Sequence, residues 1–271
     1  MRSVVAVGLV CLGVASVSAQ GLSGKGQYPQ YRGASGLPGS FFGLTYDGKP
    51  SMDGAMAMAT PIGYSLSNYH LAFGASNLSK DSKIRWIGIN EDGESANGTG
   101  QIMMGFSTGF GNITVSDMIH SNLGDNVINL LWQAPLKKEG LGVALGVQDL
   151  LERGGSAGVN QPTDHDNRRT VFAVATYRVQ KGTHVSLGYG NNRFEGIFGN
   201  VSHNITPRLK VMGEYDTFNW NYGVSWNVGP LLPGDSEYEV LEKPERRRGD
   251  IFVSLGIVKE KKINWGITIT Y

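Results

Sequence analysis

The chain has 271 residues and a formal net charge of +1, and only 17% of its residues are charged. Ordinary soluble domains carry about 25% charged residues and about 7% glycine, whereas glycine supplies 39 residues here. The near-neutral charge gives no electrostatic basis for binding nucleic acid, so none is expected as a partner. A glycine-rich, charge-poor chain of this length is ample for one large β domain.

The first residues have the order of a secretory signal. Arg2 gives a positive start, an apolar run covers residues 4–14, and small residues lead to a cleavage site after Ala19. The run is shorter than the ~20 residues of a membrane-spanning helix. We therefore expect a signal peptide over residues 1–19, which would remove the single cysteine, Cys11, from the mature chain. No later apolar run is long enough for a spanning helix, which leaves a soluble exported protein or a β-barrel.

The part after the signal divides into a lead-in and a strand-rich region. Residues 20–54 are rich in Gly, Ser, Pro and Tyr, and we expect a flexible lead-in or a candidate lumenal plug there. The barrel is expected over residues 55–271, and residues 37–46 and 55–64 are two candidates for short strands. From residue 68 onward, strand-like segments recur about every 10 to 15 residues with turn signals between them. They are residues 69–75, 84–90, 102–110, 112–120, 127–134, 141–150, 170–179, 183–191, 196–204, 209–216, 218–228, 250–258 and 263–271.

Alternation within these segments predicts a membrane barrel. In residues 218–226 and 263–271, aromatic and aliphatic side chains alternate with small or polar ones. A strand shows alternate side chains to opposite faces, and segments of ~9–11 residues suit a tilted membrane strand. The sequence therefore predicts an all-β fold, an antiparallel transmembrane β-barrel of about 12–14 strands. The even number that such barrels use requires a further strand at 55–64 or 237–242, or the loss of an early one.

The same alternation assigns the two faces of the barrel. Lipid should contact one set of side chains, namely Trp220, Tyr222, Trp226, Trp265, Ile267, Ile269 and Tyr271. The lumen should contain the intervening polar set, namely Lys210, Glu214, Asp216, Asn219, Asn221, Ser225 and Asn227. The aromatic C-terminal strand is typical of outer-membrane barrels, so outer-membrane lipid and the barrel-assembly machinery are expected partners.

Residues 141–228 carry a family resemblance. Its clearest runs are Thr206-Pro207-Arg208-Leu209, Glu214-Tyr215-Asp216 and Asn221-Tyr222-Gly223-Val224, with Leu187-Gly188-Tyr189-Gly190 and residues 142–150 and 196–199 before them. These runs resemble the YjbH-like outer-membrane barrels found with exopolysaccharide production and export systems. The resemblance implies a barrel in an envelope polysaccharide context, with polysaccharide or export-system proteins as partners and no catalytic site.

The carboxylates of Glu214 and Asp216 allow two interpretations. Their i, i+2 spacing places them ~7 Å apart on one face of a strand, a separation that suits acid/base chemistry. The favoured interpretation is that they are lumenal charges neutralised by Lys210 or Arg178, because enclosed charges need partners. The alternative is a saccharide-contacting patch that they form with Asn219 and Asn221.

Other chemical motifs are weak. Residues 105–109 match G-x-S-x-G around Ser107, but the flanks predict strands on both sides, whereas a nucleophile elbow joins a strand to a helix. The cluster at residues 164–167 lacks the spacing of a calcium or zinc site, and no cofactor motif is present.

The sequence therefore predicts a non-enzymatic outer-membrane barrel that is linked to surface polysaccharide production or export or acts as a narrow pore. The rivals are a soluble secreted β-sandwich that binds glycans and, less favoured, a barrel-embedded esterase.

Overall fold

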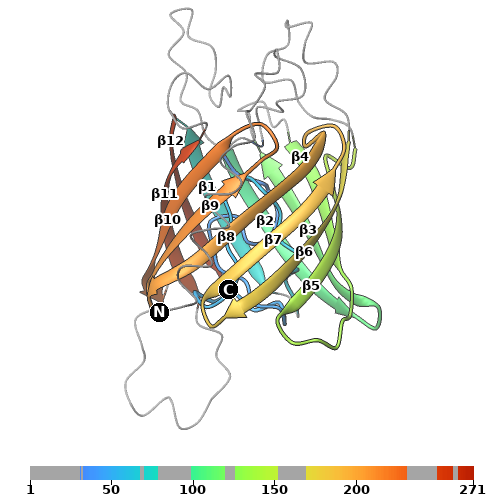
Figure 1. Cartoon of the computed structure of the whole chain (residues 1–271), viewed down its shortest axis with the longest axis horizontal. Coiled ribbons are helices and arrows are strands. Elements are labelled where there is room, and N and C mark those ends of the chain that lie inside the picture. The colour runs from blue at the N-terminus through green and yellow to red at the C-terminus, as the bar shows by residue number, and fades with distance from the viewer. Residues whose placement is uncertain are drawn as a thin grey trace, which may run out of the picture.

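The computed structural model describes residues 31, 33–67, 70–78, 99–119, 126–151, 169–230, 249–258 and 262–271. Twelve antiparallel strands, each paired with its sequence neighbours, close into a single barrel (Figure 1). The strands are β1 (Leu71–Leu78), β2 (Thr99–Thr108), β3 (Gly111–Ile119), β4 (Asn126–Gln133), β5 (Leu141–Gln148), β6 (Thr170–Gln180), β7 (Thr183–Gly190), β8 (Gly196–Thr206), β9 (Leu209–Tyr215), β10 (Trp220–Pro230), β11 (Asp250–Val258) and β12 (Lys262–Thr270). Within the described ranges, no helix is both long and apolar enough to cross a membrane.

The barrel closes between the first and last strands. β1 pairs with β12 from Ala72 opposite Thr270 to Leu78 opposite Asn264. Beyond this ladder, Leu71 and Tyr271 exchange backbone hydrogen bonds of 2.9 and 2.8 Å. Closure leaves no unpaired sheet edge, which is the condition for placing a sheet in hydrocarbon. It also excludes the two-sheet sandwich that was the rival architecture.

The two ends of the barrel differ. One end, here the C-terminal end, contains Tyr271 and the tight turns at residues 109–110, 181–182 and 207–208. At the opposite end, β7 and β8 are joined through residues 191–195, and β9 and β10 through residues 216–219. Figure 1 shows that the hairpins of β5, β6 and β7 reach the end where the C-terminus lies.

The outer face is apolar and has aromatic side chains toward both ends. Leu187, Tyr189 and Ile197 are 63%, 66% and 60% exposed. At the opposite end, the ring of Trp220 lies 5.2 Å from that of Tyr215 and 6.5 Å from that of Tyr222, centroid to centroid. At the C-terminal end, the Trp132 indole donates a 2.8 Å hydrogen bond to the carbonyl of the exposed Phe110. An apolar band between aromatic ends is the surface that a transmembrane barrel presents to lipid.

Residues 33–67, here the lumenal segment, lie inside the barrel, where Figure 1 shows them as a blue trace. The segment forms no helix and no strand, only isolated bridges such as Ser40 to Ala57 and Leu44 to Ala55. Most of its side chains are buried, and the largest ones with no exposed surface include Phe41, Phe42 and Tyr64. The barrel is therefore filled over the described length of this segment.

This arrangement corrects part of the sequence interpretation. A barrel beginning at residue 55 is wrong, because residues 55–67 belong to the lumenal segment and β1 begins at Leu71. The strand expected at 55–64 is therefore absent. The segments at 84–90 and 237–242 and the signal at 1–19 lie outside the described residues. Since β10 pairs directly with β11, the sheet closes with no strand between them.

A lysine at the middle of the outer face of β12 should destabilise the barrel more than one near its end. Ile267→Lys should cost about 2–4 kcal/mol of unfolding free energy, because it places a charge near the bilayer midplane. Ile263→Lys, on the same face near the first residue of β12, should cost about 0–1 kcal/mol. Urea unfolding in phospholipid vesicles measures both values, and equal costs would contradict the assignment of this face to lipid.

Candidate functional site

The contact between the lumenal segment and the barrel wall depends first on glycines of the inner face. A Cβ atom on Gly142 of β5 would lie 2.4 Å from the Gly63 carbonyl oxygen and 2.4 Å from the Tyr64 ring. A Cβ atom on Gly223 or Gly256 would lie 2.7 or 2.5 Å from the sulfur of Met58. The wall glycines, which have no side chain, therefore leave the space that the lumenal segment occupies.

Glu214 of β9 is the main polar anchor of the segment. Its side chain is buried, and its carboxylate accepts hydrogen bonds from the backbone amides of Met58, Ala59 and Thr60 at 2.9–3.2 Å. The Thr60 hydroxyl donates at 2.9 Å and the Asn221 amide at 3.0 Å. A carboxylate that accepts several donors in a buried place forms strong charge-assisted bonds. Glu214 thus fixes the middle of the segment to the wall.

Arg193, in the turn between β7 and β8, holds the same stretch from the other side. Its guanidinium donates to the carbonyls of Ala59 and Tyr31, the latter at 2.9 Å, and to the Gln148 side chain at 3.1 Å. It also lies over the Phe194 ring, 4.5 Å from the centroid. Ala59 therefore donates to Glu214 through its amide and accepts from Arg193 through its carbonyl. Tyr31, the first residue described, lies toward the opposite end of the barrel.

Lys210 of β9 acts at the C-terminal end. Its ammonium donates to the carbonyls of Gly54 at 2.7 Å and Gly182 at 3.3 Å, so it links the lumenal segment to the β6–β7 turn. The expected neutralisation of Glu214 by Lys210 or Arg178 is therefore not what the contacts provide. Glu214 is held by backbone amides, and Arg178 pairs with Glu139 at 2.5 Å.

Further wall side chains bond to the backbone of the segment. They are wall groups with amide or hydroxyl functions, namely Thr114, Ser116, Asn129, Gln133, Gln148, Thr176, Asn200, Ser202 and Asn264. Because an irregular segment satisfies only part of its own backbone groups, these side chains supply partners for the rest.

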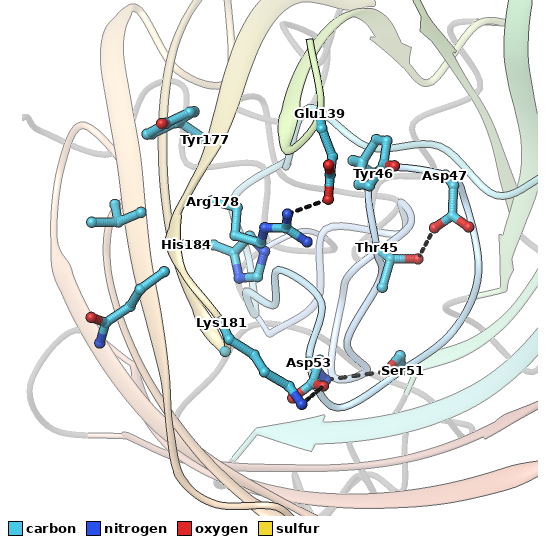
Figure 2. A pocket seen from close by; sticks show the side chains of 13 residues that line it. Thr45, Tyr46, Asp47, Ser51, Asp53, Glu139, Tyr177, Arg178, Lys181 and His184 are labelled. Carbon is cyan, nitrogen blue, oxygen red and sulfur yellow. Dashed lines mark hydrogen bonds and ion pairs between the residues drawn. The ribbon is translucent and has the colours of Figure 1, made fainter. Parts of the chain in front are cut away.

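A cavity of about 710 Å³, here the mouth cavity, opens at the C-terminal end between the lumenal segment and strands β6 and β7 (Figure 2). The segment contributes residues 45–47, 51 and 53, and Glu139 comes from the β4–β5 turn. Arg178, Lys181 and His184 form the facing wall. Burial alone would raise the pKa of the Asp47 carboxyl at this mouth, but bonds from Thr45 and Lys49 outweigh it and lower that pKa below its usual value.

The structure places the sequence-predicted lumenal residues as follows. Lys210, Glu214, Asp216, Asn221 and Ser225 are buried, while Asn219 and Asn227 are half-buried. Asp216 accepts from the backbone amides of Phe218 and Asn219 at 3.1 and 2.7 Å, so it mainly closes the β9–β10 turn. Asn221 joins Asp216 to Glu214. Asn219 does not complete a shared patch with Asn221, because Asn219 lies in the turn.

The residues assigned to lipid lie on the outer face. Tyr222, Trp226, Trp265, Ile267 and Tyr271 are exposed, and Trp220 and Ile269 are half-buried. Sequence reasoning missed Arg193 and the wall amides, since a single Arg in a turn or a Gln in a strand has no pattern that signals a lumenal partner.

The G-x-S-x-G motif forms no recognisable site. Ser107 lies in β2 and donates a 2.9 Å hydrogen bond to Asn112 of β3, so the surrounding geometry is strand, turn and strand. The nucleophile elbow of an esterase is therefore not formed. The cluster at 164–167 lies outside the described residues. Among the residues that are described, no group of three or more His, Cys, Asp or Glu side chains is arranged to hold a metal ion.

Comparison with known proteins yields only likenesses in solved structures, since neither a family model nor a curated protein matches the chain. The KdgM porin in complex with disordered oligogalacturonate aligns with a TM-score of 0.44 at 7% identity, over 74% of this chain and 98% of that one. The Acinetobacter baumannii outer membrane protein Omp33 aligns with a TM-score of 0.38 at 8% identity, over 75% and 96%. A mutant of the Rh. blastica porin aligns with a TM-score of 0.33 at 10% identity, over 64% of this chain and 55% of that one. Scores this low carry no argument about activity.

Replacing Glu214 with glutamine should loosen the lumenal segment while leaving the sheet intact. Glutamine keeps the shape of the side chain, but it places an NH₂ group where the unaltered protein has a carboxylate oxygen that accepts hydrogen bonds. A buried donor that loses its acceptor costs about 1–3 kcal/mol. Hydrogen exchange at the Met58, Ala59 and Thr60 amides should accelerate accordingly. Glu139→Gln, which removes an exposed ion pair worth about 0–1 kcal/mol, is the matched control. Unchanged exchange in the Glu214 variant would contradict the anchor.

Proposed function

We propose that this protein is a non-enzymatic channel of an outer membrane, a narrow pore whose passage is closed by its lumenal segment. The observation that carries the proposal is the construction of the lumen. A polar wall surrounds residues 33–67, and the segment is bound through side chains such as Glu214 and Lys210.

The lumenal segment can move without breaking the barrel. Each of the twelve strands pairs with its two neighbours, and the lumenal segment contributes no strand to this closed sheet. Displacing the segment would therefore leave every interstrand ladder intact. It would expose Glu214, Lys210 and Asn129 to a water-filled lumen, the environment that such side chains prefer.

The outer-membrane location rests on the apolar outer face and on the export signal that the sequence predicts. Lipid and, through β12, the barrel-assembly machinery are the partners that we propose.

The resemblance to YjbH-like barrels supports a further proposal, that the channel works beside proteins that produce or export a surface polysaccharide. Deleting the gene should then lower the amount of polysaccharide released by cells. Unchanged release would remove this part of the proposal and leave the channel itself untouched.

A reversible disulfide between the segment and the wall tests the channel. The hydroxyl oxygens of Ser65 and Thr114 lie 2.7 Å apart, so cysteines at both positions come within disulfide range. The double variant Ser65→Cys, Thr114→Cys in planar bilayers should stay closed when oxidised and should conduct under applied voltage when reduced.

The matched control is Ser225→Cys with Ser254→Cys, whose hydroxyl oxygens lie 2.8 Å apart on two neighbouring wall strands. Its conductance should be equal in both redox states, because this bond does not hold the segment. If the reduced lumenal pair never conducts at any voltage that the bilayer withstands, the barrel is a filled scaffold rather than a channel.

A further inference from the structure

The mouth cavity has the properties of a ligand site as well as those of an entrance. Its volume of about 710 Å³ lies within the range of about 300–1,000 Å³ that small-molecule sites occupy. Figure 2 shows its side chains arranged around a central space, with Arg178 and His184 on one side and Tyr46, Thr45 and Asp47 on the other. The space is thus bounded by both the wall and the lumenal segment.

His184 bounds the cavity at its inner side. It lines the cavity and is only 2% exposed. Its ring packs edge-on against Tyr64 at 5.9 Å. Its Nδ1 atom is enclosed by protein and has no hydrogen-bond partner among the residues that the structure describes, so His184 limits the cavity through its ring.

The charges around the cavity select the kind of ligand. Each lining carboxylate already has a cation: Asp47 pairs with Lys49 at 3.0 Å, Glu139 with Arg178 at 2.5 Å and Asp53 with Lys181 at 3.5 Å. A charged ligand would compete with the partner that each of these lining groups already has. A ligand with neutral hydroxyl groups can accept from the cation and donate to the carboxylate of the same pair.

We propose that the mouth cavity binds an uncharged, hydroxyl-rich ligand of the size of a short linear oligosaccharide. The proposal deepens the proposed function and rests on it, because this ligand would be the solute that the channel receives at its C-terminal end. The Tyr46 ring lines the cavity, and the Arg178 guanidinium lies over it, 5.8 Å from the centroid.

Titration calorimetry on the full mature protein in detergent tests this site. The probes are maltotetraose and cellotetraose as uncharged ligands, a glucuronate tetramer as the anionic one and tetraglycine as the zwitterionic one. At least one uncharged probe should bind, and neither charged probe should bind more tightly. Tyr46→Ala and Arg178→Gln should each weaken binding about tenfold.

Arg208→Gln is the matched control, since Arg208 is an exposed cation in the β8–β9 turn at the same end and does not line the cavity. Its affinity should equal that of the unaltered protein, and a heat-dependent shift in gel mobility checks that every variant is folded. Tighter binding of a charged probe, no binding of either uncharged probe, or binding that survives both cavity substitutions would overturn the proposal.

The two proposals fail in different ways. Binding is measured without any current, so a silent channel with a functional cavity would remove the pore and keep the site. Redox-dependent conductance with no calorimetric binding would keep the pore and remove the ligand.

Discussion

The structure depends on one constraint: an irregular segment enclosed in a barrel must find partners outside itself for the backbone groups that it does not pair internally. Backbone bonds such as Phe41 to Ala57 and Leu44 to Ala55 satisfy part of residues 33–67, whereas the amides of residues 58–60, 63, 65 and 66 bond to wall side chains. Water cannot reach most of them, and each unpaired group would cost several kcal/mol by an order-of-magnitude estimate. The wall therefore presents a carboxylate, amides, hydroxyls and cations toward the backbone of the segment, and this requirement determines which residues occupy the inner face.

The same constraint explains the unusual composition. Many inner positions are polar groups that bond to the segment or glycines that let it approach, as Gly142 does for Gly63 and Gly256 for Met58. Apolar inner side chains such as Phe252 and Met212 pack with the segment in one cluster. The small and polar face that would suggest a water-filled lumen is therefore also the face that an enclosed, partly apolar segment requires.

The alternation on which the sequence analysis relied was sufficient for the barrel but insufficient for its contents. Every second side chain of a strand faces lipid, and lipid requires an apolar side chain at each of these positions. Outer positions such as Trp265 and Ile267 can therefore be predicted from the local sequence pattern. Residues 55–59 alternate alanine with methionine and resemble a strand, yet Met56 and Met58 are both fully buried in the lumen. Their conformation is set by partners more than 140 residues away, such as Ser202 and Glu214, and no local pattern encodes such contacts.

The attachment of the lumenal segment to the wall is strongest at residues 58–60 and weaker near the mouth cavity. Ala59 is bound by Glu214 and by Arg193, both buried, so residues 58–60 are held by charge-assisted bonds shielded from water. Near the mouth cavity, residue 53 is held partly by an ion pair with the exposed Lys181, a contact that contributes little, and the pair of Asp47 with Lys49 lies within the segment itself. Since local opening begins where stabilisation is weakest, the turn at residues 45–53 should loosen first and residues 58–60 last. Opening would then proceed inward from the C-terminal end, where the mouth cavity lies.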